Sequence, residues 1–213
     1  MTSLTHLRKE YRLQQLNRDD VSENAMHQFD HWWQDALNSK IEEVNAMTLA
    51  TASVDGLPAA RIVLLKGFHA DGFQFYTNYE SFKGRQLSEN PRACLVFFWK
   101  ELERQIRITG LVEKLGEKES EEYFRTRPEG SRIGAWASPQ STVIESNDWL
   151  IQQANNFEKK FSDSEIPKPP HWGGFLVRPV TIEFWQGRPN RLHDRLLYTL
   201  QGNGQWIIER LAP

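Results

Sequence analysis

The sequence lacks the features that mark several large classes of protein. It has 1 cysteine in 213 residues, so no disulfide can form within the chain, which is typical of a reducing compartment. Cys94 lies in an apolar run, where a thiol packs as a small hydrophobic group and is a poor candidate for a nucleophile. The net charge of −2 gives no general attraction to nucleic acid or to an anionic membrane. The first 20 residues hold no apolar segment of a signal peptide or membrane span, so we expect a cytoplasmic protein.

The sequence motifs of common catalytic sites are also missing. There is no His-Glu-x-x-His, Cys-x-x-Cys or Gly-x-Ser-x-Gly, and no glycine-rich phosphate loop of the Walker or Rossmann kind. His27 and His31 are four residues apart on a predicted helix, but no third ligand accompanies them. We therefore expect a solvated helix face there and no metal site.

The residues that are present predict a mainly β fold with flanking helices. Apolar residues at helical spacing predict a helix from Ser22, as its N-cap, to about Ser39. Alternating segments between Gly, Asp and Pro turns predict strands over 46–53, 59–68, 73–78, 93–100, 103–115, 173–185, 195–200 and 205–210. Further helices are expected over 81–90, 117–126 and 145–161, with a loop holding 130–136. This pattern favours a closed or half-open antiparallel barrel: one domain over 21–213, behind a mobile segment 1–20.

The stretch 181–195 carries an unusual concentration of cationic and titratable groups. It begins as a strand, breaks at Gly-Arg-Pro-Asn, and then resumes. If the resumed part is extended, Arg191, His193 and Arg195 share one face. Such a face beside Trp185 is costly unless something anionic binds there.

Other polar sets indicate further anion-binding positions. Alternation puts Arg61 and Lys66 on opposite faces of one strand, unless a bulge or the end of the strand re-aims one of them. Thr77, Ser81 and Lys83 stand where a strand meets a helix and suit a phosphate, although simple N-capping by Ser81 explains them as well. Gln105, the cluster Tyr123, Arg127 and Ser131, and the pair Gln140-Ser141 are further polar candidates. Together they indicate a ligand with an aromatic ring and a phosphate group.

The stretch 182–195 resembles the signature of the pyridoxamine 5′-phosphate oxidase family. It reads Ile182-Glu183-Phe184-Trp185-Gln186-Gly187, then a turn, then Arg191-Leu192-His193-Asp194-Arg195. Companion segments follow the family's order over nearly the whole chain, among them 61–66, 75–78, 102–105, 133–136, 172–175 and 209–213. The resemblance implies a homodimeric, antiparallel, Greek-key-like FMN-binding split β-barrel with FMN at the subunit interface. It further implies oxidation of pyridoxamine or pyridoxine 5′-phosphate to pyridoxal 5′-phosphate, with O₂ as electron acceptor and H₂O₂ as by-product.

The resemblance also implies a role for each matching residue. Those expected to bind FMN are Arg61, Ile62, Val63, Leu64, Leu65, Lys66, Tyr76, Thr77, Lys83, Gln105, Gln140, Ser141, Trp185 and Arg195, with Gln140 and Ser141 reaching in from the partner subunit. Those expected to bind the substrate are Arg8, Tyr11, Lys66, Tyr123, Arg127, Ser131, Arg191, Leu192 and His193. Within this set Tyr123, Arg127 and Ser131 take the phosphate, and Arg8 and Tyr11 form a lid. Arg191 and His193 are the catalytic pair at the reacting carbon.

One departure and two alternatives stand beside this interpretation. Phe82 occupies a position where the family often has a second basic residue, so one contact to the FMN phosphate is missing. A protein of this fold could instead carry flavin, haem or pyridoxal phosphate without turnover, but the Arg191 and His193 pair argues against that. It could also be a reductase that uses FMN or a deazaflavin, and the complete substrate-phosphate set argues against that.

Overall fold

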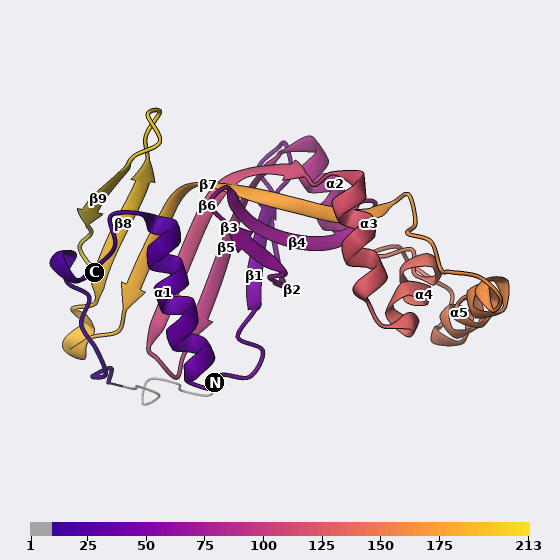
Figure 1. Ribbon diagram of the computed structural model, residues 1–213, viewed down its shortest axis with the longest axis horizontal. Coiled ribbons are helices and arrows are strands. Elements are labelled where there is room, and N and C mark those ends of the chain that lie inside the picture. Colours follow the sequence, from indigo (N-terminus) through magenta and orange to yellow (C-terminus); the bar gives the residue numbers. More distant parts are fainter. Residues whose placement is uncertain (1–9) are drawn as a thin grey trace, which may run out of the picture.

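The computed structural model describes residues 10–213. Its centre is one antiparallel sheet of nine strands in the order β2-β1-β5-β6-β7-β4-β3, with β8 pairing β7 and β9 pairing β8 (Figure 1). The strands are β1 Ala46–Ala52, β2 Pro58–Leu64, β3 Gly67–His69, β4 Gly72–Asn78, β5 Arg92–Trp99, β6 Arg104–Lys114, β7 Trp172–Gln186, β8 Asp194–Leu200 and β9 Trp206–Arg210. The helices are α1 Ala25–Asn38, α2 Phe82–Glu89, α3 Glu117–Thr126, α4 Glu129–Ala137 and α5 Asn147–Phe161, with short 3-10 turns η1 Arg18–Asp20 and η2 Pro189–Arg191. The prediction of a half-open, mainly β fold with flanking helices is confirmed.

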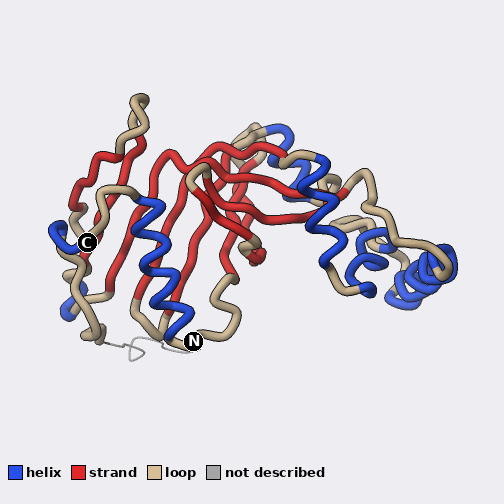
Figure 2. Tube along the Cα trace, viewed as in Figure 1, coloured by secondary structure: helices blue, strands red, loops and turns tan. Residues whose placement is uncertain are grey.

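The long strand β7 holds the sheet together. One of its edges pairs with β6 over nearly the whole length, while the other edge pairs first with β4 and then with β8. The change of partner comes beside an irregularity in the register between Thr109 and Gly110. A Cβ on Gly110 would lie 2.2 Å from the carbonyl oxygen of Arg178, so only glycine allows this close approach of the two backbones. Because β7 pairs with β4 in its first part and with β8 in its last part, the sheet opens into two arms (Figure 2).

Helix α1 covers the main hydrophobic core. Phe29 on this helix is fully buried, with its ring 4.8 Å from Phe73 and 5.5 Å from Phe97 between centroids. Much of the aromatic content therefore fills the core. The helix begins later than expected: Asn24 is its N-cap and accepts from the amides of Met26 and His27. Ser22 instead accepts from the amide of Asn24.

A second, smaller core lies under α3, α4 and α5, at the opposite end of the molecule from β8 and β9 (Figure 1). It is built on Phe124, Ile133, Ile166 and Trp172. The expected loop over 130–136 is wrong, because this segment belongs to α4. Ile133 and Ala137 are four residues apart and both buried, which gives a helix an apolar face despite the Gly and Ser around them.

The other sequence predictions agree in element type, with one strand divided. The expected strand over 59–68 is two strands, because β2 ends at Leu64 and β3 begins at Gly67. Between them the amide of Leu65 donates to Asn45 and that of Lys66 donates to Gln74, so the chain changes its hydrogen-bonding partner strand. Among the described residues no helix is both long enough and apolar enough for a membrane span.

Candidate active site

A cavity of about 730 Å³ opens between β2, β4, α3 and α4. Its lining joins residues expected at the cofactor with residues expected at the substrate phosphate. From the cofactor set it contains Ile62, Val63, Leu64, Lys66, Tyr76, Thr77, Lys83 and Gln140, and from the phosphate set Tyr123, Arg127 and Ser131. Segments far apart in the sequence thus meet at one concave site, which is typical of a small-molecule pocket.

Lys83 provides a positive charge at one side of this cavity. The residue is only 8% exposed, and its Nζ donates to Thr77 Oγ1 at 3.1 Å, Ser81 Oγ at 3.3 Å and Gln140 Oε1 at 3.2 Å. All three acceptors are uncharged. Burial, and next the charge of Arg61, lower the pKa of Lys83 to about 8. An ammonium group that is buried near a second cation and held by neutral oxygens is suited to an anionic ligand.

Arg61 lies in the middle of β2, and Lys66 lies two residues beyond the end of that strand. The guanidinium of Arg61 donates to the Leu49 carbonyl at 3.2 Å and to Thr51 Oγ1 at 2.6 Å, and burial lowers its pKa. Lys66 lies beyond the last residue of β2 and lines the cavity. Because β2 ends before Lys66, the strict alternation that would put Arg61 and Lys66 on opposite faces does not extend to Lys66.

Arg127 provides a second positive charge in the cavity. Its Nη1 is buried and has no hydrogen-bond partner among the described residues. Its Cζ lies 4.6 Å from the ring centroid of Trp172 and 5.5 Å from that of Phe124, and burial lowers the pKa of the guanidinium. A buried N–H without an acceptor is destabilising unless a ligand provides one. Arg127 is therefore a second anion-binding position, distinct from Lys83.

The aromatic side of the cavity is a set of nearly parallel rings. Tyr76 and Tyr123 stack with centroids 3.9 Å apart, and Trp172 lies 5.7 Å from Tyr76 at an interplanar angle of 13°. Burial, and next the charge of Glu119, raise the pKa of Tyr76 to about 12, so its hydroxyl stays protonated at neutral pH. Flat, neutral rings beside two cations suit a ligand that is both aromatic and phosphorylated.

A separate cluster of predicted residues lies at the other end of β7. The strand registers Gln105↔Trp185 and Trp185↔Arg195 put these three residues in one row across β6, β7 and β8. The His193 ring lies 4.6 Å from Trp185, and the Tyr11 ring lies 5.7 Å from Trp185 and 6.0 Å from His193. We call Gln105, Trp185, His193 and Arg195 the strand-end cluster.

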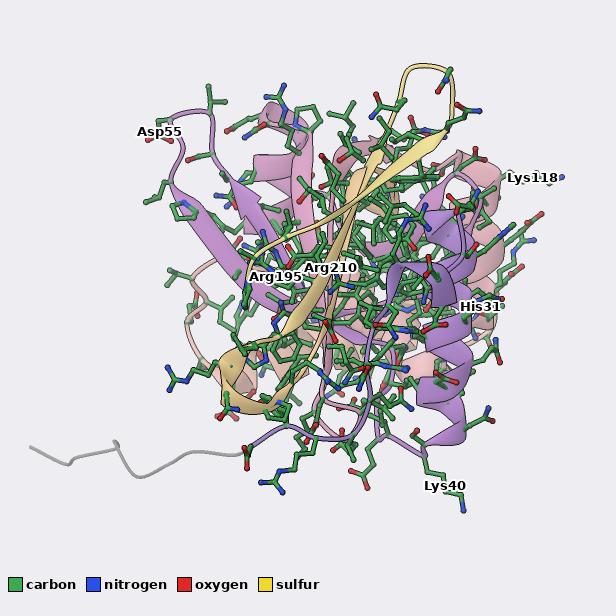
Figure 3. All side chains as sticks on the ribbon, turned by 90° about the vertical axis from the view of Figure 1, so that its left-hand side faces the viewer. His31, Lys40, Asp55, Lys118, Arg195 and Arg210 are labelled. Atoms are coloured by element: carbon green, nitrogen blue, oxygen red, sulfur yellow. The ribbon has the colours of Figure 1, made fainter. Side chains whose placement is uncertain are left out.

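Arg195 is held in place by hydrogen bonds to neighbouring groups. Its Nε donates to the buried carboxylate of Glu183 at 2.8 Å, and its Nη1 donates to the Ala212 carbonyl at 2.8 Å. Figure 3 labels Arg195 on β8 beside Arg210 on β9, and it also labels His31 on α1. His27 and His31 are both exposed, as expected for a solvated helix face.

The expectation that Arg191 belongs to an extended segment is wrong. Residues Pro189–Arg191 form the turn η2, and Asn190 and Arg191 have φ of 54° and 63°. Arg191 and Leu192 are therefore exposed. Of the three residues expected on one face, Arg191, His193 and Arg195, only Arg195 belongs to a strand. The turn arises because Pro189 fixes its own φ and Asn tolerates the left-handed region.

His193 has a defined hydrogen-bonding state. Its Nδ1 accepts from the backbone amide of Arg188 at 3.1 Å, which places the proton of the neutral ring on Nε2. Burial, and next the charge of Arg191, lower the pKa of His193. The imidazole is therefore neutral at pH 7 and presents an N–H donor.

The positions of Gln140, Ser141 and Leu65 can be described within one chain. Gln140 was expected to reach in from a partner subunit, but it hydrogen-bonds Thr77 and Lys83 of its own chain. Ser141 follows it on the exposed loop, outside the cavity lining. The Leu65 side chain packs in the main core, not in the cavity. Arg8 lies outside the described residues.

The cavity also contains residues to which the sequence assigned no role. They include Asn78, Thr126, Pro128, Gly134, Ala135, Ser138 and Trp172. Trp172 stands in the family-like segment 172–175, and that segment was the available signal. Its contact with Arg127 depends on how α3 packs against β7, which periodicity does not predict.

Comparisons with known proteins agree with the fold. The family described as "Pyridoxamine 5'-phosphate oxidase" matches residues 33–160, and the "Pyridoxine 5'-phosphate oxidase C-terminal dimerisation region" matches residues 172–213. The chain is 55% identical to a pyridoxine/pyridoxamine 5′-phosphate oxidase of Salinibacter ruber, with 100% of each chain covered. It is also 55% identical to one of Nostoc punctiforme, with 99% of each covered.

Two solved structures share the architecture. PhzG from Burkholderia lata, in complex with tetrahydrophenazine-1-carboxylic acid, is 30% identical with a TM-score of 0.87, covering 93% of this chain and 98% of that one. A pyridoxamine 5′-phosphate oxidase-related, FMN-binding protein from Nostoc punctiforme has a TM-score of 0.71 at 19% identity, covering 87% and 97%, and shows likeness of fold alone. Since the family matches cover most of the sequence and the relatives align from end to end, the chain belongs to the pyridoxamine 5′-phosphate oxidase family.

Proposed function

We propose that this protein oxidises pyridoxamine 5′-phosphate and pyridoxine 5′-phosphate to pyridoxal 5′-phosphate. FMN is its cofactor and O₂ its electron acceptor, which is released as H₂O₂. The observation that carries the proposal is a single cavity with two separate cationic positions, Lys83 and Arg127, and a wall of stacked aromatic rings between polar groups. Two phosphorylated aromatic molecules, a cofactor and a substrate, would account for both positions.

The residues around Lys83 fit the phosphate of FMN. Lys83 supplies a charge and Thr77 a hydroxyl on the side of the cavity where α2 begins, and Arg61, which is not in the lining, adds a second charge near Lys83. Phe82 is 45% exposed and is not among the lining residues, so this chain lacks a charge there. Arg85 does not replace it, because its exposed guanidinium donates to the Glu80 carbonyl. Bound there, FMN would supply the hydride-accepting chemistry.

The substrate phosphate is assigned to Arg127, Tyr123 and Ser131. The free Nη1 of Arg127 offers a charge-assisted hydrogen bond that is stronger than a neutral one. Fixing the phosphate, which takes no part in the reaction, orients the far end of the substrate and lowers the entropic part of the barrier. Lys66 lines the same cavity and completes the set within one chain.

The remaining roles require a second copy of the chain. Trp172 in the cavity and Trp185 in the strand-end cluster stand at opposite ends of one continuous strand. At about 3.3 Å per residue, the thirteen steps from Trp172 to Trp185 span roughly 40 Å along the strand. We therefore assign the FMN site to a dimer interface, where Gln105, Trp185 and Arg195 of the partner subunit meet the cavity. The match of residues 172–213 to a dimerisation region supports this assignment.

In that arrangement Arg191 and His193 of the partner subunit cover the substrate ring. Arg191 remains cationic and attracts the electron-rich ring and its substituents. His193 is neutral, and its Nε2–H can donate to the ring hydroxyl group or its anion. Exposed apolar side chains on β2 and β5, Ile62 at 65% and Phe98 at 55%, would be covered by the same contact between subunits.

An anaerobic spectral titration tests the cofactor, the substrate and the chemistry together. The purified protein should be yellow, and pyridoxamine 5′-phosphate added without O₂ should bleach the flavin absorbance. Readmitted O₂ should restore the colour, with pyridoxal 5′-phosphate and H₂O₂ formed in equal amounts. A flavin that stays oxidised would identify a carrier protein, and turnover that depends on a nicotinamide or deazaflavin would identify a reductase. Either result would refute the proposed oxidase.

A further inference from the structure

Trp172 forms the support on which the guanidinium of Arg127 rests. The residue opens β7, is 6% exposed, and belongs to the smaller core. The Arg127 Cζ lies 4.6 Å from its ring centroid, closer than to the Phe124 ring at 5.5 Å. A guanidinium over an indole face gains a cation–π attraction, which strengthens when both groups are desolvated.

This support has a chemical consequence for Arg127. The described residues contain no ion pair to its guanidinium, and its buried Nη1 has no acceptor. A carboxylate in place of the indole would hold the side chain equally well, but it would occupy the N–H groups and cancel the charge. An aromatic face stabilises the cation and leaves its N–H edge available for a bidentate contact to phosphate.

Trp172 is itself held on several sides. Its carbonyl accepts from the buried Lys168 Nζ at 3.0 Å, and its amide donates to the Pro169 carbonyl at 3.1 Å. Its ring is nearly parallel to Tyr123, at an interplanar angle of 7° with centroids 6.2 Å apart. The indole is thus fixed by the backbone on one side and by the aromatic wall of the cavity on the other, so it can fix Arg127 in turn.

We propose that Trp172 is a positioning residue that sets the affinity of the site for the substrate phosphate by holding Arg127 with its N–H groups free. The inference rests on the proposed function, because it takes Arg127 to be the ligand of the substrate phosphate. It adds a residue that acts through Arg127.

The test compares Trp172→Leu and Trp172→Phe as FMN-loaded enzymes. Trp172→Leu should raise the KM for pyridoxamine 5′-phosphate about tenfold, the size expected for loss of a desolvated cation–π contact, with kcat changed by less than about twofold. The inhibition constant of inorganic phosphate should rise by a similar factor, since phosphate probes the anion site without the ring. Trp172→Phe keeps an aromatic face and should stay within about threefold of the unsubstituted enzyme in both constants.

Two controls separate positioning from a general structural role. Trp136→Leu makes the same change beside the same core, where the indole contacts Phe157 and Phe161 and donates to the Pro167 carbonyl, and should leave the phosphate inhibition constant unchanged. In an Arg127→Ala background, Trp172→Leu should have no further effect on KM, because residues that act through one another are not additive.

An unchanged KM in Trp172→Leu, or an undiminished effect in the Arg127→Ala background, would overturn the inference. So would equal effects of Trp172→Leu and Trp136→Leu. If Trp172→Leu does not fold, the test uses Trp172→Phe alone and in combination with Arg127→Ala. Any change in KM that Trp172→Phe causes must then vanish in the Arg127→Ala background. These results are distinct from failure of the proposed function, in which the unsubstituted enzyme itself would not oxidise pyridoxamine 5′-phosphate.

Discussion

The side chain of Lys83 lowers the stability of the ligand-free fold but favours the binding of an anion. Its ammonium group is buried, its acceptors are neutral, and Arg61 lies close enough to lower its pKa further. The folded protein therefore binds this proton less tightly than the unfolded chain does. By linkage, the contribution of Lys83 to stability rises with pH between about 8 and its ordinary value of 10.5, and it is unfavourable below that window. A bound phosphate removes the penalty by supplying the missing counter-charge.

Replacement of Lys83 by Met should therefore have opposite effects on stability and on cofactor binding. At pH 7 we expect the FMN-free Lys83→Met protein to melt at a higher temperature than the unsubstituted one. Its dissociation constant for FMN should rise by about ten- to a hundredfold, the scale of a charge-assisted contact to phosphate. Calorimetry of the FMN-free protein and fluorescence titration with FMN measure the two effects.

The pH dependence of FMN binding provides a control for this explanation. The affinity of the unsubstituted protein should weaken as the pH rises through about 8, because Lys83 then loses its charge, and the difference from Lys83→Met should shrink. A Lys83→Arg protein, which keeps its charge over this range, should lack that step. If the unsubstituted and Lys83→Met proteins differ by a constant factor from pH 7 to pH 10, the charge of Lys83 is not what binds the phosphate.

At the scale of elements, the segment over residues 10–17 is tied across the strand-end cluster. The buried carboxylate of Glu103 accepts from the amides of Arg12 at 2.8 Å and Leu13 at 3.1 Å. Farther along, the Leu16 amide donates to Asp194. Glu103 has φ of 55°, a strained conformation for a residue with a side chain, and such strain is found where a position serves a function. The segment thus brings Tyr11 against Trp185 and His193.

We expect Glu103→Gln to loosen this segment without unfolding the sheet. The amide side chain keeps one acceptor but loses the charge, so hydrogen exchange of the Arg12 and Leu13 amides should accelerate by about tenfold, in line with a weakened charge-assisted hydrogen bond. The KM for pyridoxamine 5′-phosphate should rise while the FMN content stays normal. Glu101→Gln alters a neighbouring exposed carboxylate, paired with Lys100, and should change neither quantity. Equal exchange rates in the two variants would exclude Glu103 as the anchor of the segment.

The elements also show how far the sequence alone could predict this structure. Strong alternation located β5 and β6 to within a residue, because half-buried strands follow a period of two. The mostly buried strands β4 and β7 were located by their apolar residues and the Gly and Pro turns before them. Helix α4 was missed, since Gly130, Ser131 and Gly134 are poor helix formers and only packing against α5 makes up for them. The break at Gly187–Asn190 was predicted, but its extension through Arg191 was missed because a left-handed Arg191 has no signature in composition. That residues 1–20 move as a lid stays a prediction.

The candidate site was less predictable than the elements. Alternation put Gln105 on a polar face, but only the register across three strands aligned it with Trp185 and Arg195. The roles assigned to these residues came from the resemblance to the family. That Gln140 and Ser141 serve the FMN site of the partner subunit stays a prediction.

At the scale of the whole molecule, β7 sets the functional unit. Its two ends carry two incomplete sets of groups, the cavity with Arg127 and the strand-end cluster with His193. In the proposed two-fold dimer they would form two equivalent sites, each with a cavity from one subunit and a cluster from the other. In such a dimer, a subunit with a damaged cavity and a subunit with a damaged cluster together leave one of the two sites intact.

Subunit mixing provides a test of this arrangement. At a pyridoxamine 5′-phosphate concentration far below the raised KM of Arg127→Ala, homodimers of Arg127→Ala and of Arg191→Ala should each show little activity, the first through the cavity and the second through the turn beside the cluster. When the two variants are refolded together in equal amounts, half of the dimers contain one subunit of each. Each mixed dimer then has one site with both defects and one site with none. The mixture should therefore recover about a quarter of the unsubstituted activity. Mixing Arg127→Ala with Lys66→Ala, two cavity variants, should recover nothing, because every site then has a defective cavity. If the first mixture is also inactive although exchange of subunits is verified by mass, each site lies within a single chain and the shared-site arrangement is wrong.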